Sequence, residues 1–481
     1  MIWNQPVVAP HYDFNSLIED HPDLQKLITV DGHYSFSHQP TVRTLTAAIL
    51  KKYHGITSEL SPHHLCPRVP NRYLYLQWLS QISEIILPKG DWSMISVVDI
   101  GTGSSAIYPL LGASMNKGWK FVGTECNEGS YKLAMANIGR NPWVEGKIKV
   151  VKVVDPRKIL DFTKISIDNN NNNNNKDQLV LVMCNPPFFD TELKNSVEFD
   201  TKIAATKLVA TDSELFYPGG EIRFIKQMIA ESVVQQQHVN RWYTSMVGQF
   251  TSLKPIIEEL KTKGIINFGI FELNPGHHHN NNNGKNIDQG LDRYIDDGSS
   301  NTPIIRWVVF WSFQATHIPD FLGHQYSNKY KGLNGLITTF KINLKTPRIN
   351  IVPVIFDKLL KPLNCIEIST SKMMMFKGTN NPSDEFNVVE VVVAGDVWSR
   401  AYRRKLKRLT AVTTKTESEN PGVAVKKQRG SGVLFPDKDK SIFQVIFDDV
   451  HNQIVVFWKF GYNEKIFESF CGLVNREVNS T

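Results

Sequence analysis

Residues Asn185-Pro186-Pro187-Phe188 combine an amide, a restrained backbone and an aromatic ring within four positions. The Asn185 side-chain oxygen and a backbone carbonyl can accept the two hydrogens of a planar amino group, while the Phe188 ring stacks on the group that carries it. Asn-Pro and Pro-Pro dipeptides are also common in ordinary turns after a strand. By itself, this tetrad therefore indicates either a site for an amino or amide nitrogen or a plain turn.

A glycine-rich loop lies upstream of the tetrad. The apolar run 95–100 carries Asp99 near its end and is followed by Gly101-Thr102-Gly103-Ser104-Ser105. Glycines let the backbone approach a ligand closely, and the start of a following helix presents free N–H groups. The third glycine of the dinucleotide fingerprint is absent, so this loop favours a nucleoside without a pyrophosphate, such as S-adenosylmethionine.

Glu125 ends a short apolar segment about 20 residues after the glycine loop, a spacing that suits hydrogen bonds to ribose hydroxyls in a doubly wound fold. A surface glutamate at a strand end is the alternative. The glycine loop, Glu125 and the tetrad each follow an apolar run, the last of which covers residues 179–184. Open α/β sheets bind ligands at the carboxyl ends of their strands, so the three segments together predict one site.

Alternating apolar runs and helical patterns predict an α/β sheet of seven strands, with the last strand antiparallel because no obvious helix precedes it. The expected strands cover residues 95–100, 120–125, 148–154, 178–184, 242–247, 266–273 and 304–313. Helices are expected over 17–28, 41–53 and 72–85 before the sheet, and over 251–263 within it. The Asn run 169–175 and the His-Asn run 277–283 are expected to be loops, and the three histidines are interpreted as low-complexity sequence, not as metal ligands.

Composition narrows the class of protein. The chain has 481 residues, enough for two or three domains, and 41% of them are hydrophobic. Its five cysteines are scattered without C-x-x-C spacing, which favours a reducing compartment and argues against a structural zinc site. We find no signal peptide or membrane-spanning apolar stretch, and a net charge of +7 is compatible with RNA binding through a local patch.

The sequence after residue 385 predicts a small α+β unit. Strands are expected over 386–394, 443–448 and 453–460, with helices over 398–409 and 464–474 and a loop over 410–432. The first helix is basic, with Arg403, Arg404, Lys405, Lys407 and Arg408 as candidate RNA contacts. A solvated charged face and a nuclear localisation signal are the other interpretations of this helix.

In these motifs the chain resembles the methyltransferase-like protein 16 family of RNA adenine-N6 methyltransferases. It is also similar to bacterial enzymes that modify an adenine of large-subunit ribosomal RNA. The resemblance covers roughly residues 10–315 and rests on RYLYLQW (72–78), DIGTGSSAIYPLLG (99–112), CNPPFF (184–189), GGEIRF (219–224), RWYTSMVG (241–248) and RWVVFWSF (306–313), together with residues 13–27. A C-terminal region like that of the eukaryotic members favours the branch whose usual target is U6 small nuclear RNA.

The resemblance implies a class I, Rossmann-like methyltransferase sheet with S-adenosylmethionine as donor and structured RNA, a hairpin or loop, as acceptor. It implies that the tetrad Asn185, Pro186, Pro187 and Phe188 is catalytic. It places the donor against Arg72, Asp99, Gly101, Gly103, Ser105, Glu125 and Asn185, with Arg72 pairing with the donor carboxylate. Residues 156–158 resemble a loop that can obstruct the donor pocket, although Ile159 stands where relatives carry Thr.

Four domains follow as expectations: an N-terminal helical extension (1–90), the methyltransferase core (91–315), a connector (316–385) and a C-terminal RNA-binding domain (386–481). Residues 1–10 lack Lys and Arg, unlike the basic arm of relatives. Messenger RNA hairpins are further possible targets. The alternatives are a ribosomal RNA methyltransferase, a protein glutamine-N5 methyltransferase, a DNA amino-methyltransferase and a non-catalytic RNA-binding protein. We expect a nuclear and cytoplasmic protein without a metal or a membrane partner, and the oligomeric state is left open.

Overall fold

The computed structural model divides the chain into two compact units, and each is described by itself. One unit comprises Pro6–Gln314 and Gly323–Gly335; the other comprises Met1–Gln5, Ala315–Leu322 and Leu336–Thr481. The four expected domains are a finer division, which stays a prediction. The structure describes residues 2–3, 7–10, 12–28, 38–87, 92–155, 157–162, 165, 178–194, 196–197, 199, 209–235, 240–274, 305–320, 328–333, 335–344, 359–360, 367–375, 384–399, 404, 440–448 and 452–480.

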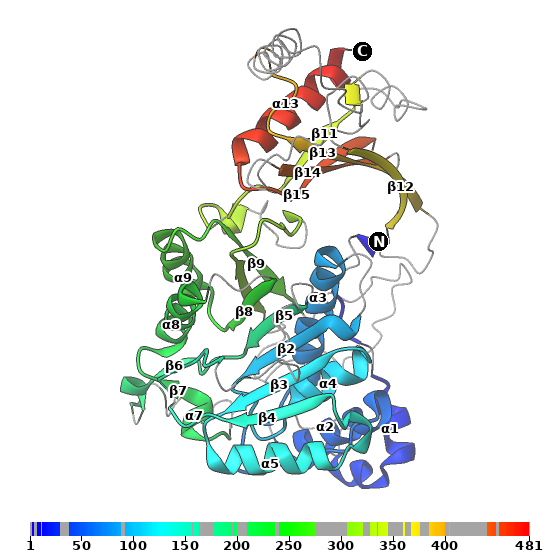
Figure 1. Ribbon diagram of the computed structural model, residues 1–481. Helices are drawn as coiled ribbons and strands as arrows, with labels where there is room; N and C mark the ends of the chain where they lie inside the picture. The colour runs from blue at the N-terminus through cyan, green and yellow to red at the C-terminus, as the bar shows by residue number, and fades with distance from the viewer. Residues whose placement is uncertain are drawn as a thin grey trace, which may run out of the picture. The chain divides into compact units, whose positions relative to one another are not determined.

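A seven-stranded sheet forms the centre of the first unit (Figure 1). Its strand order is β4-β3-β2-β5-β8-β10-β9. The strands are β2 (Ile95–Ile100), β3 (Lys120–Glu125), β4 (Ile148–Lys152), β5 (Leu179–Cys184), β8 (Arg241–Val247), β9 (Asn267–Leu273) and β10 (Arg306–Ser312). The strands from β4 to β8 pair in parallel, whereas β10 runs antiparallel to both neighbours. The predicted α/β class and the antiparallel last strand are thus confirmed.

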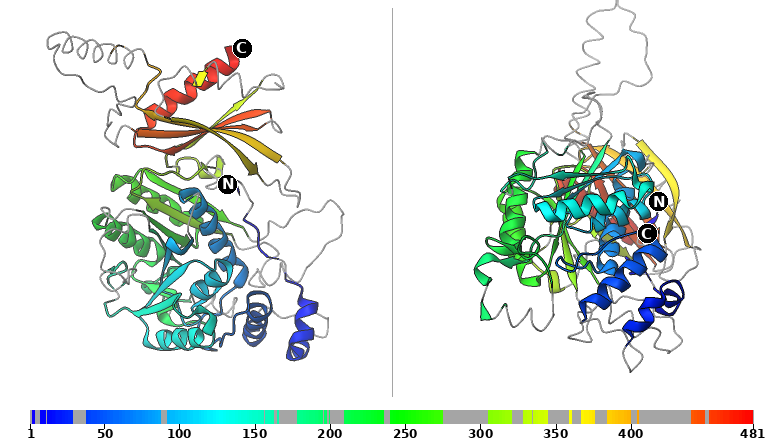
Figure 2. Two further views of the ribbon diagram at one scale, coloured as in Figure 1. Left: turned by 45° about the vertical axis from the view of Figure 1, so that its right-hand side comes forward. Right: turned by 90° about the horizontal axis from the view of Figure 1, so that it is seen from below.

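Helices cover the two faces of this sheet, as right-handed crossovers require. Figures 1 and 2 show α8 (Gly220–Val234) and α9 (Phe250–Thr262) on one side and α3 (Val69–Ile86) and α4 (Ile107–Met115) on the other. Strands β2 and β5 are buried along their whole length, which explains their unbroken apolar sequence. The sheet is therefore a rigid support for whatever lies at its strand ends.

The helical extension before the sheet differs in one place from its prediction. The single helix expected over residues 17–28 is two elements, α1 (Phe14–Asp20) and the 3-10 helix η1 (Pro22–Leu27). Pro22 has no N–H to donate and disfavours a helical conformation at His21, so the α-helix stops there. The other two helices are confirmed, with α2 spanning Gln39–His54 and α3 following after a loop.

Two buried asparagines of α5 (Glu128–Gly139) and its C-terminal flank hold the loop between α2 and α3, residues 55–68, which we call the strap. Asn141 pairs with both the N–H and the carbonyl of Thr57, at 2.9 and 2.8 Å. Asn137 accepts the N–H of Glu59 at 2.8 Å and donates to its carbonyl and to that of Ser104, both at 3.1 Å. One amide therefore fixes the strap and the glycine loop together.

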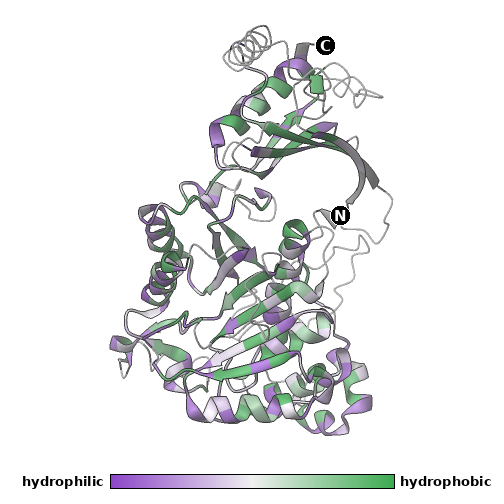
Figure 3. Ribbon diagram, viewed as in Figure 1, coloured by the Kyte–Doolittle hydropathy of each residue, from purple (hydrophilic) through white to green (hydrophobic). Residues whose placement is uncertain are grey.

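The second unit contains a six-stranded sheet in the order β1-β12-β13-β14-β15-β11 and the helix α13 (Glu464–Ser480). Its strands are β1 (Ile2–Trp3), β11 (Thr339–Asn343), β12 (Glu367–Met375), β13 (Asp384–Ala394), β14 (Lys440–Asp448) and β15 (Gln453–Phe460). Purple and green alternate along α13 in Figure 3, and its apolar residues Phe467, Phe470 and Val474 join one core with the sheet. The α+β prediction is confirmed, although β1, β11 and β12 are not among the expected strands.

The basic helix expected over residues 398–409 lies mostly outside the described residues. Trp398 lies in a turn instead of starting the helix, and Arg404 is helical and exposed. Arg403, Lys405, Lys407 and Arg408 fall outside the described residues, as do both Asn-rich runs. No helix in the described part of the chain has the length and apolar character needed to cross a membrane.

Replacing Asn137 with Ala should lower the free energy of unfolding, because the buried carbonyl of Ser104 and the backbone of Glu59 would lose their partner. The expected loss is on the order of 2–3 kcal/mol, measured by urea unfolding. As a control on the same helix, Lys132→Ala at an exposed position should change it by less than about 0.5 kcal/mol. Equal effects of the two substitutions would contradict the role given to Asn137.

Candidate functional site

The register of three parallel strands brings the predicted site residues to one edge of the sheet. Ile100 at the end of β2 pairs with Thr124 of β3 and with Cys184 of β5. Gly101, Glu125 and Asn185 follow these three residues directly in the sequence. The segments that the sequence analysis singled out separately are therefore neighbours.

The glycine loop needs its glycines because Gly101 and Gly103 both have φ of 70°, in the left-handed region. The Gly101 N–H donates to the Thr124 hydroxyl at 3.3 Å, and the Gly103 N–H donates to Glu125 Oε2 at 2.9 Å. Both bonds tie the loop to β3, so the loop is held from the neighbouring strand.

Glu125 is buried and has a structural task besides any ligand contact. Its Oε1 accepts the Asn127 N–H at 2.8 Å, while Oε2 accepts the Gly103 N–H. Burial raises the pKa of Glu125, and these backbone donors offset part of that increase. Each carboxylate oxygen keeps a second lone pair, so Glu125 can still accept a hydrogen bond from a ligand hydroxyl.

Asp99 is fully buried at the end of β2, and burial raises its pKa to about 7. The Thr102 hydroxyl lowers that pKa and the nearby Glu125 carboxylate raises it further. A buried carboxylate in this state is stabilised in its charged form by any cationic group that a ligand brings close to it.

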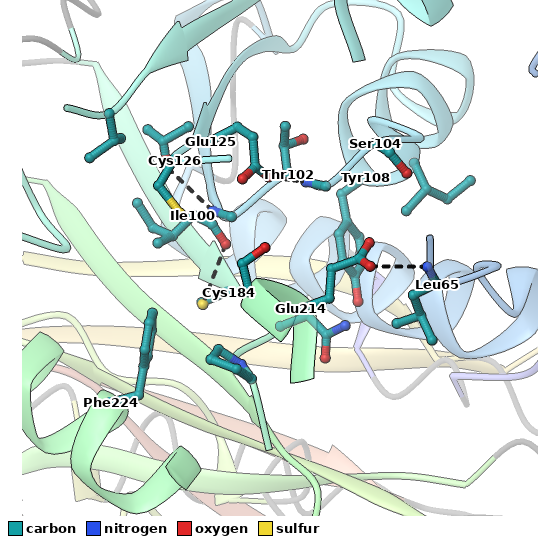
Figure 4. A pocket seen from close by; sticks show the side chains of 18 of the residues that line it. Leu65, Ile100, Thr102, Ser104, Tyr108, Glu125, Cys126, Cys184, Glu214 and Phe224 are labelled. Atoms are coloured by element: carbon teal, nitrogen blue, oxygen red, sulfur yellow. Dashed lines mark hydrogen bonds between the residues drawn. The ribbon is translucent and has the colours of Figure 1, made fainter. Parts of the chain in front are cut away.

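These elements surround a cavity of about 270 Å³, close to the lower end of the range usual for small-molecule sites (Figure 4). Six of the seven predicted donor-binding residues line it: Arg72, Gly101, Gly103, Ser105, Glu125 and Asn185. Asp99 does not line the cavity; it is the next-to-last residue of β2, directly before the lining residue Ile100. Further parts of the wall come from the strap, through Leu65 and Pro67, and from residues after the tetrad, among them Glu214, Phe216, Tyr217 and Phe224.

Four polar atoms of the cavity wall are buried and have no hydrogen-bond partner among the described residues. They are Nε of Arg72, the hydroxyl oxygens of Thr102 and Tyr108, and Oδ1 of Asn185. Buried polar groups are costly without a partner, so a cluster of them at one cavity is typical of a binding site for a polar ligand. Their mix of donors and acceptors fits a ligand with a carboxylate at one end and an amino group at the other.

Only two residues of the tetrad line the cavity. Asn185 and Pro187 line the cavity, whereas Pro186 is buried and does not line it. Phe188 is half-buried outside the cavity wall, close to Gly248 at the end of β8, with the Arg306 guanidinium 5.8 Å from its ring centre. The amide and the ring thus face different surroundings on either side of a short, proline-stiffened link.

Glu214 is a wall residue that the sequence analysis missed. Its Oε2 accepts the Leu65 N–H of the strap at 3.1 Å, which Figure 4 shows, and the Thr211 N–H at 2.7 Å. It belongs to the capping box of α7 (Asp212–Leu215). The pattern Thr-x-x-Glu is a known helix-start signal and could have marked α7, but the contact with Leu65, 149 residues away, has no local signal.

The segment that resembles an obstructing loop contributes Lys158 and Ile159 to the cavity wall. Its backbone is held by Glu231 of α8, which accepts the N–H groups of Ile159 and Leu160 at 3.3 and 2.6 Å. Pro156 lies outside the described residues, and the His-Asn run does as well. In the described part of the chain no cluster of His, Cys, Asp or Glu could hold a metal ion.

The raised pKa of Asp99 makes stability depend on pH. Between the unfolded value of 3.8 and the folded value of about 7, the folded protein holds a proton that the unfolded chain releases. This contribution is complete below the unfolded pKa and is lost as the pH rises through the folded one. The urea midpoint should therefore fall between about pH 4 and about pH 7, and fall less in Asp99→Asn. The same decrease in both proteins would refute the assignment.

Comparison with known proteins gives the family. A family model described as RNA methyltransferase matches residues 7–282, more than half of the chain. The U6 small nuclear RNA (adenine-(43)-N(6))-methyltransferase of Schizosaccharomyces pombe is 27% identical over 93% of this chain and 96% of its own length. The RNA N(6)-adenosine-methyltransferase mettl16 of Danio rerio is 34% identical over 53% of this chain, which spans about half of that relative, 52%.

A bacterial relative matches as well. The ribosomal RNA large subunit methyltransferase F of Flavobacterium johnsoniae is 30% identical over 55% of this chain and 86% of its own length. The family match includes the strand ends, the glycine loop and the tetrad, which all lie within residues 7–282. The chain belongs to the RNA methyltransferase family.

Proposed function

We propose that this protein transfers a methyl group from S-adenosylmethionine to N6 of an adenine in structured RNA, and that U6 small nuclear RNA is its first candidate substrate. Messenger RNA hairpins are further candidates. A nuclear and cytoplasmic location is part of the same proposal, which takes the basic segment around Arg404 as an RNA contact and localisation signal.

The main support for this proposal is the unpaired side-chain oxygen of Asn185. Its Oδ1 is buried at the cavity wall and has no hydrogen-bond partner within the described residues. An amide oxygen kept in that condition suits a donor that arrives with the substrate, such as an exocyclic amino group. The rigid Pro186-Pro187 link keeps this oxygen at the end of β5, beside the glycine loop.

The cavity residues fit the donor. Arg72 would hold its carboxylate, Glu125 its ribose hydroxyls, and the backbone of Gly101 and Ser105 its methionine part. The buried charge of Asp99 would be stabilised by its ammonium group. When bound, the donor supplies an electrophilic methyl group, so no strong general base is required of the protein.

Adenine N6 is a weak nucleophile because its lone pair is delocalised into the ring. Asn185 Oδ1 and the Pro186 carbonyl would accept its two hydrogens and orient the lone pair towards the methyl group. Phe188 would stack on the base, which has to leave its own stack at a cost of about a few kcal/mol, and less in a loop or bulge.

The extent of the alignments supports U6 RNA over ribosomal RNA. The U6 enzyme of S. pombe aligns with 93% of this chain, whereas the bacterial ribosomal RNA enzyme aligns with 55%. An alignment over 93% of the chain includes most of the second unit, with its sheet and α13. The U6 enzyme therefore shares more of this chain than the ribosomal RNA enzyme does, which favours U6 RNA as the substrate.

Asn185→Ala should reduce RNA methylation by roughly 100-fold or more, because the acceptor of an amino hydrogen is lost where the lone pair must be oriented. The assay incubates the protein with labelled S-adenosylmethionine, total RNA and total protein, and identifies N6-methyladenosine by nucleoside analysis. Gln25→Ala, which removes an exposed amide from η1, is the matched control and should keep full activity.

Label found only in protein would overturn the RNA assignment and favour glutamine-N5 methylation instead. An Asn185→Ala variant with unchanged activity would remove the catalytic role of the tetrad. Label in ribosomal RNA but not in U6 RNA would keep the chemistry and change the substrate.

Glu214→Ala should weaken binding of S-adenosylhomocysteine, since the strap residue Leu65 loses the hydrogen bond that holds it over the cavity. One lost hydrogen bond corresponds to an increase of Kd by about fivefold, measured by isothermal titration calorimetry. Glu192→Ala, an exposed glutamate of the preceding segment, serves as the control. A Kd equal to that of the control would show that the strap plays no part in donor binding.

A further inference from the structure

Glu221 is a buried carboxylate near the start of α8 that takes no part in the donor cavity. It lies in the first turn of the helix, where a negative charge interacts favourably with the helix dipole. Burial raises its pKa, and hydrogen bonds with Ser252 and two backbone N–H groups offset part of that increase. A buried acid with so many donors fixes the position of whatever donates to it.

The two backbone donors belong to the turn between β8 and α9. The Gly248 N–H donates to Glu221 Oε2 at 2.7 Å, and the Gln249 N–H donates to Oε1 at 3.1 Å. The carboxylate therefore holds two consecutive peptide groups at the N-terminus of α9. Glu221 of α8 therefore fixes the position of Gly248 in the turn between β8 and α9.

Gly248 in turn lies against the ring of Phe188. A Cβ atom at position 248 would be 2.7 Å from Cδ1 and 3.0 Å from Cε1 of that ring, and 3.2 Å from Glu221 Oε2. Contacts this short cannot be accommodated without moving the ring or the carboxylate. The ring and the carboxylate thus share the space left by one missing side chain.

Gly220, which directly precedes Glu221, lies close to the backbone of residues 188–190. A Cβ at Gly220 would be 3.2 Å from the Phe188 carbonyl oxygen and 3.3 Å from the Asp190 nitrogen. The Gly219 N–H also donates to Asp190 Oδ1 at 3.0 Å. The turn Gly219-Gly220-Glu221 therefore packs closely against the backbone of residues 188–190 and, through Gly248, is linked to the Phe188 ring.

We propose that Glu221 is a positioning residue for the acceptor base: through Gly248, it sets the ring of Phe188 on which the base stacks. Glu221 touches neither donor nor base. The inference rests on the proposed function, because it assigns the stacking role to Phe188. It adds the requirement that the residue at position 248 has no side chain and that the residue at 221 accepts two hydrogen bonds.

Substitutions at Gly248 and Glu221 should impair use of the RNA substrate and leave binding of the methyl-donor product unchanged. Gly248→Ala displaces the ring, and Glu221→Gln turns one of the two acceptors into a donor that faces a backbone N–H. Each should lower kcat/KM for RNA by roughly 10- to 100-fold, as displacements of about 1 Å do, while the Kd of S-adenosylhomocysteine stays within about twofold. Gly139→Ala on α5, where a Cβ meets nothing within 4 Å, is the matched control for the glycine and should leave both values unchanged.

A double-mutant cycle tests whether the effect passes through Phe188. In a Phe188→Ala background, Gly248→Ala and Glu221→Gln should cause no further loss, because the ring they position is gone. The assay uses in vitro transcribed U6 RNA and labelled S-adenosylmethionine. Losses that multiply with that of Phe188→Ala, or a Phe188→Ala variant with full activity, would overturn the proposal.

A second measurement needs no RNA. Full-length protein with 4-fluorophenylalanine at position 188 should show a shifted ¹⁹F resonance in Gly248→Ala and Glu221→Gln, but not in Gly139→Ala. An unshifted resonance in both variants would overturn the proposal whatever the activities are. Shifted resonances in a protein that methylates no RNA would refute the proposed function and, with it, the role in acceptor binding, while upholding the chain of contacts from Glu221 to Phe188.

Discussion

The parallel register of β3, β2 and β5 is the constraint on which the site depends. It pairs Ile100 with Thr124 and with Cys184, so that the next residue on each strand faces the same space. If a buried strand slipped by one residue relative to its neighbour, every one of its apolar side chains would turn to the other face of the sheet. Hydrophobic burial, a force without direction, thereby fixes the positions of a glycine loop, a carboxylate and an amide.

The two carboxylates at this edge, Glu125 and Asp99, differ in how the protein stabilises them. Glu125 is satisfied by backbone N–H groups of Gly103 and Asn127 and acts as a support for the loop. Asp99 lies deeper, and its raised pKa reflects burial that the nearby Thr102 hydroxyl does not fully offset. Glu125 therefore supports the glycine loop, whereas the charged form of Asp99 would be stabilised by a cationic group of a ligand.

Much of the core could be predicted, because its signals are local. Continuous apolar runs gave β2 and β5 within one residue, and Asn185 and Glu125 were found because they directly follow such runs. Prediction failed where structure depends on partners far along the chain. Strand β12 contains Ser369, Thr370 and Ser371, and its polar sequence becomes a strand by pairing with β13. The long helix expected across Pro22 failed for the opposite reason, since a local breaker was overlooked.

The sequence by itself determined which residues carry the chemistry and the order in which strands present them, because residue type and hydrophobic period are properties of the chain. Only the tertiary structure decided that Asn185 and Phe188 face different surroundings, that Glu214 holds Leu65, and that Glu221 reaches Phe188 through Gly248. These contacts join residues that are tens of positions apart or more. Their geometry follows from how whole helices pack on the sheet, and no short stretch of sequence encodes that.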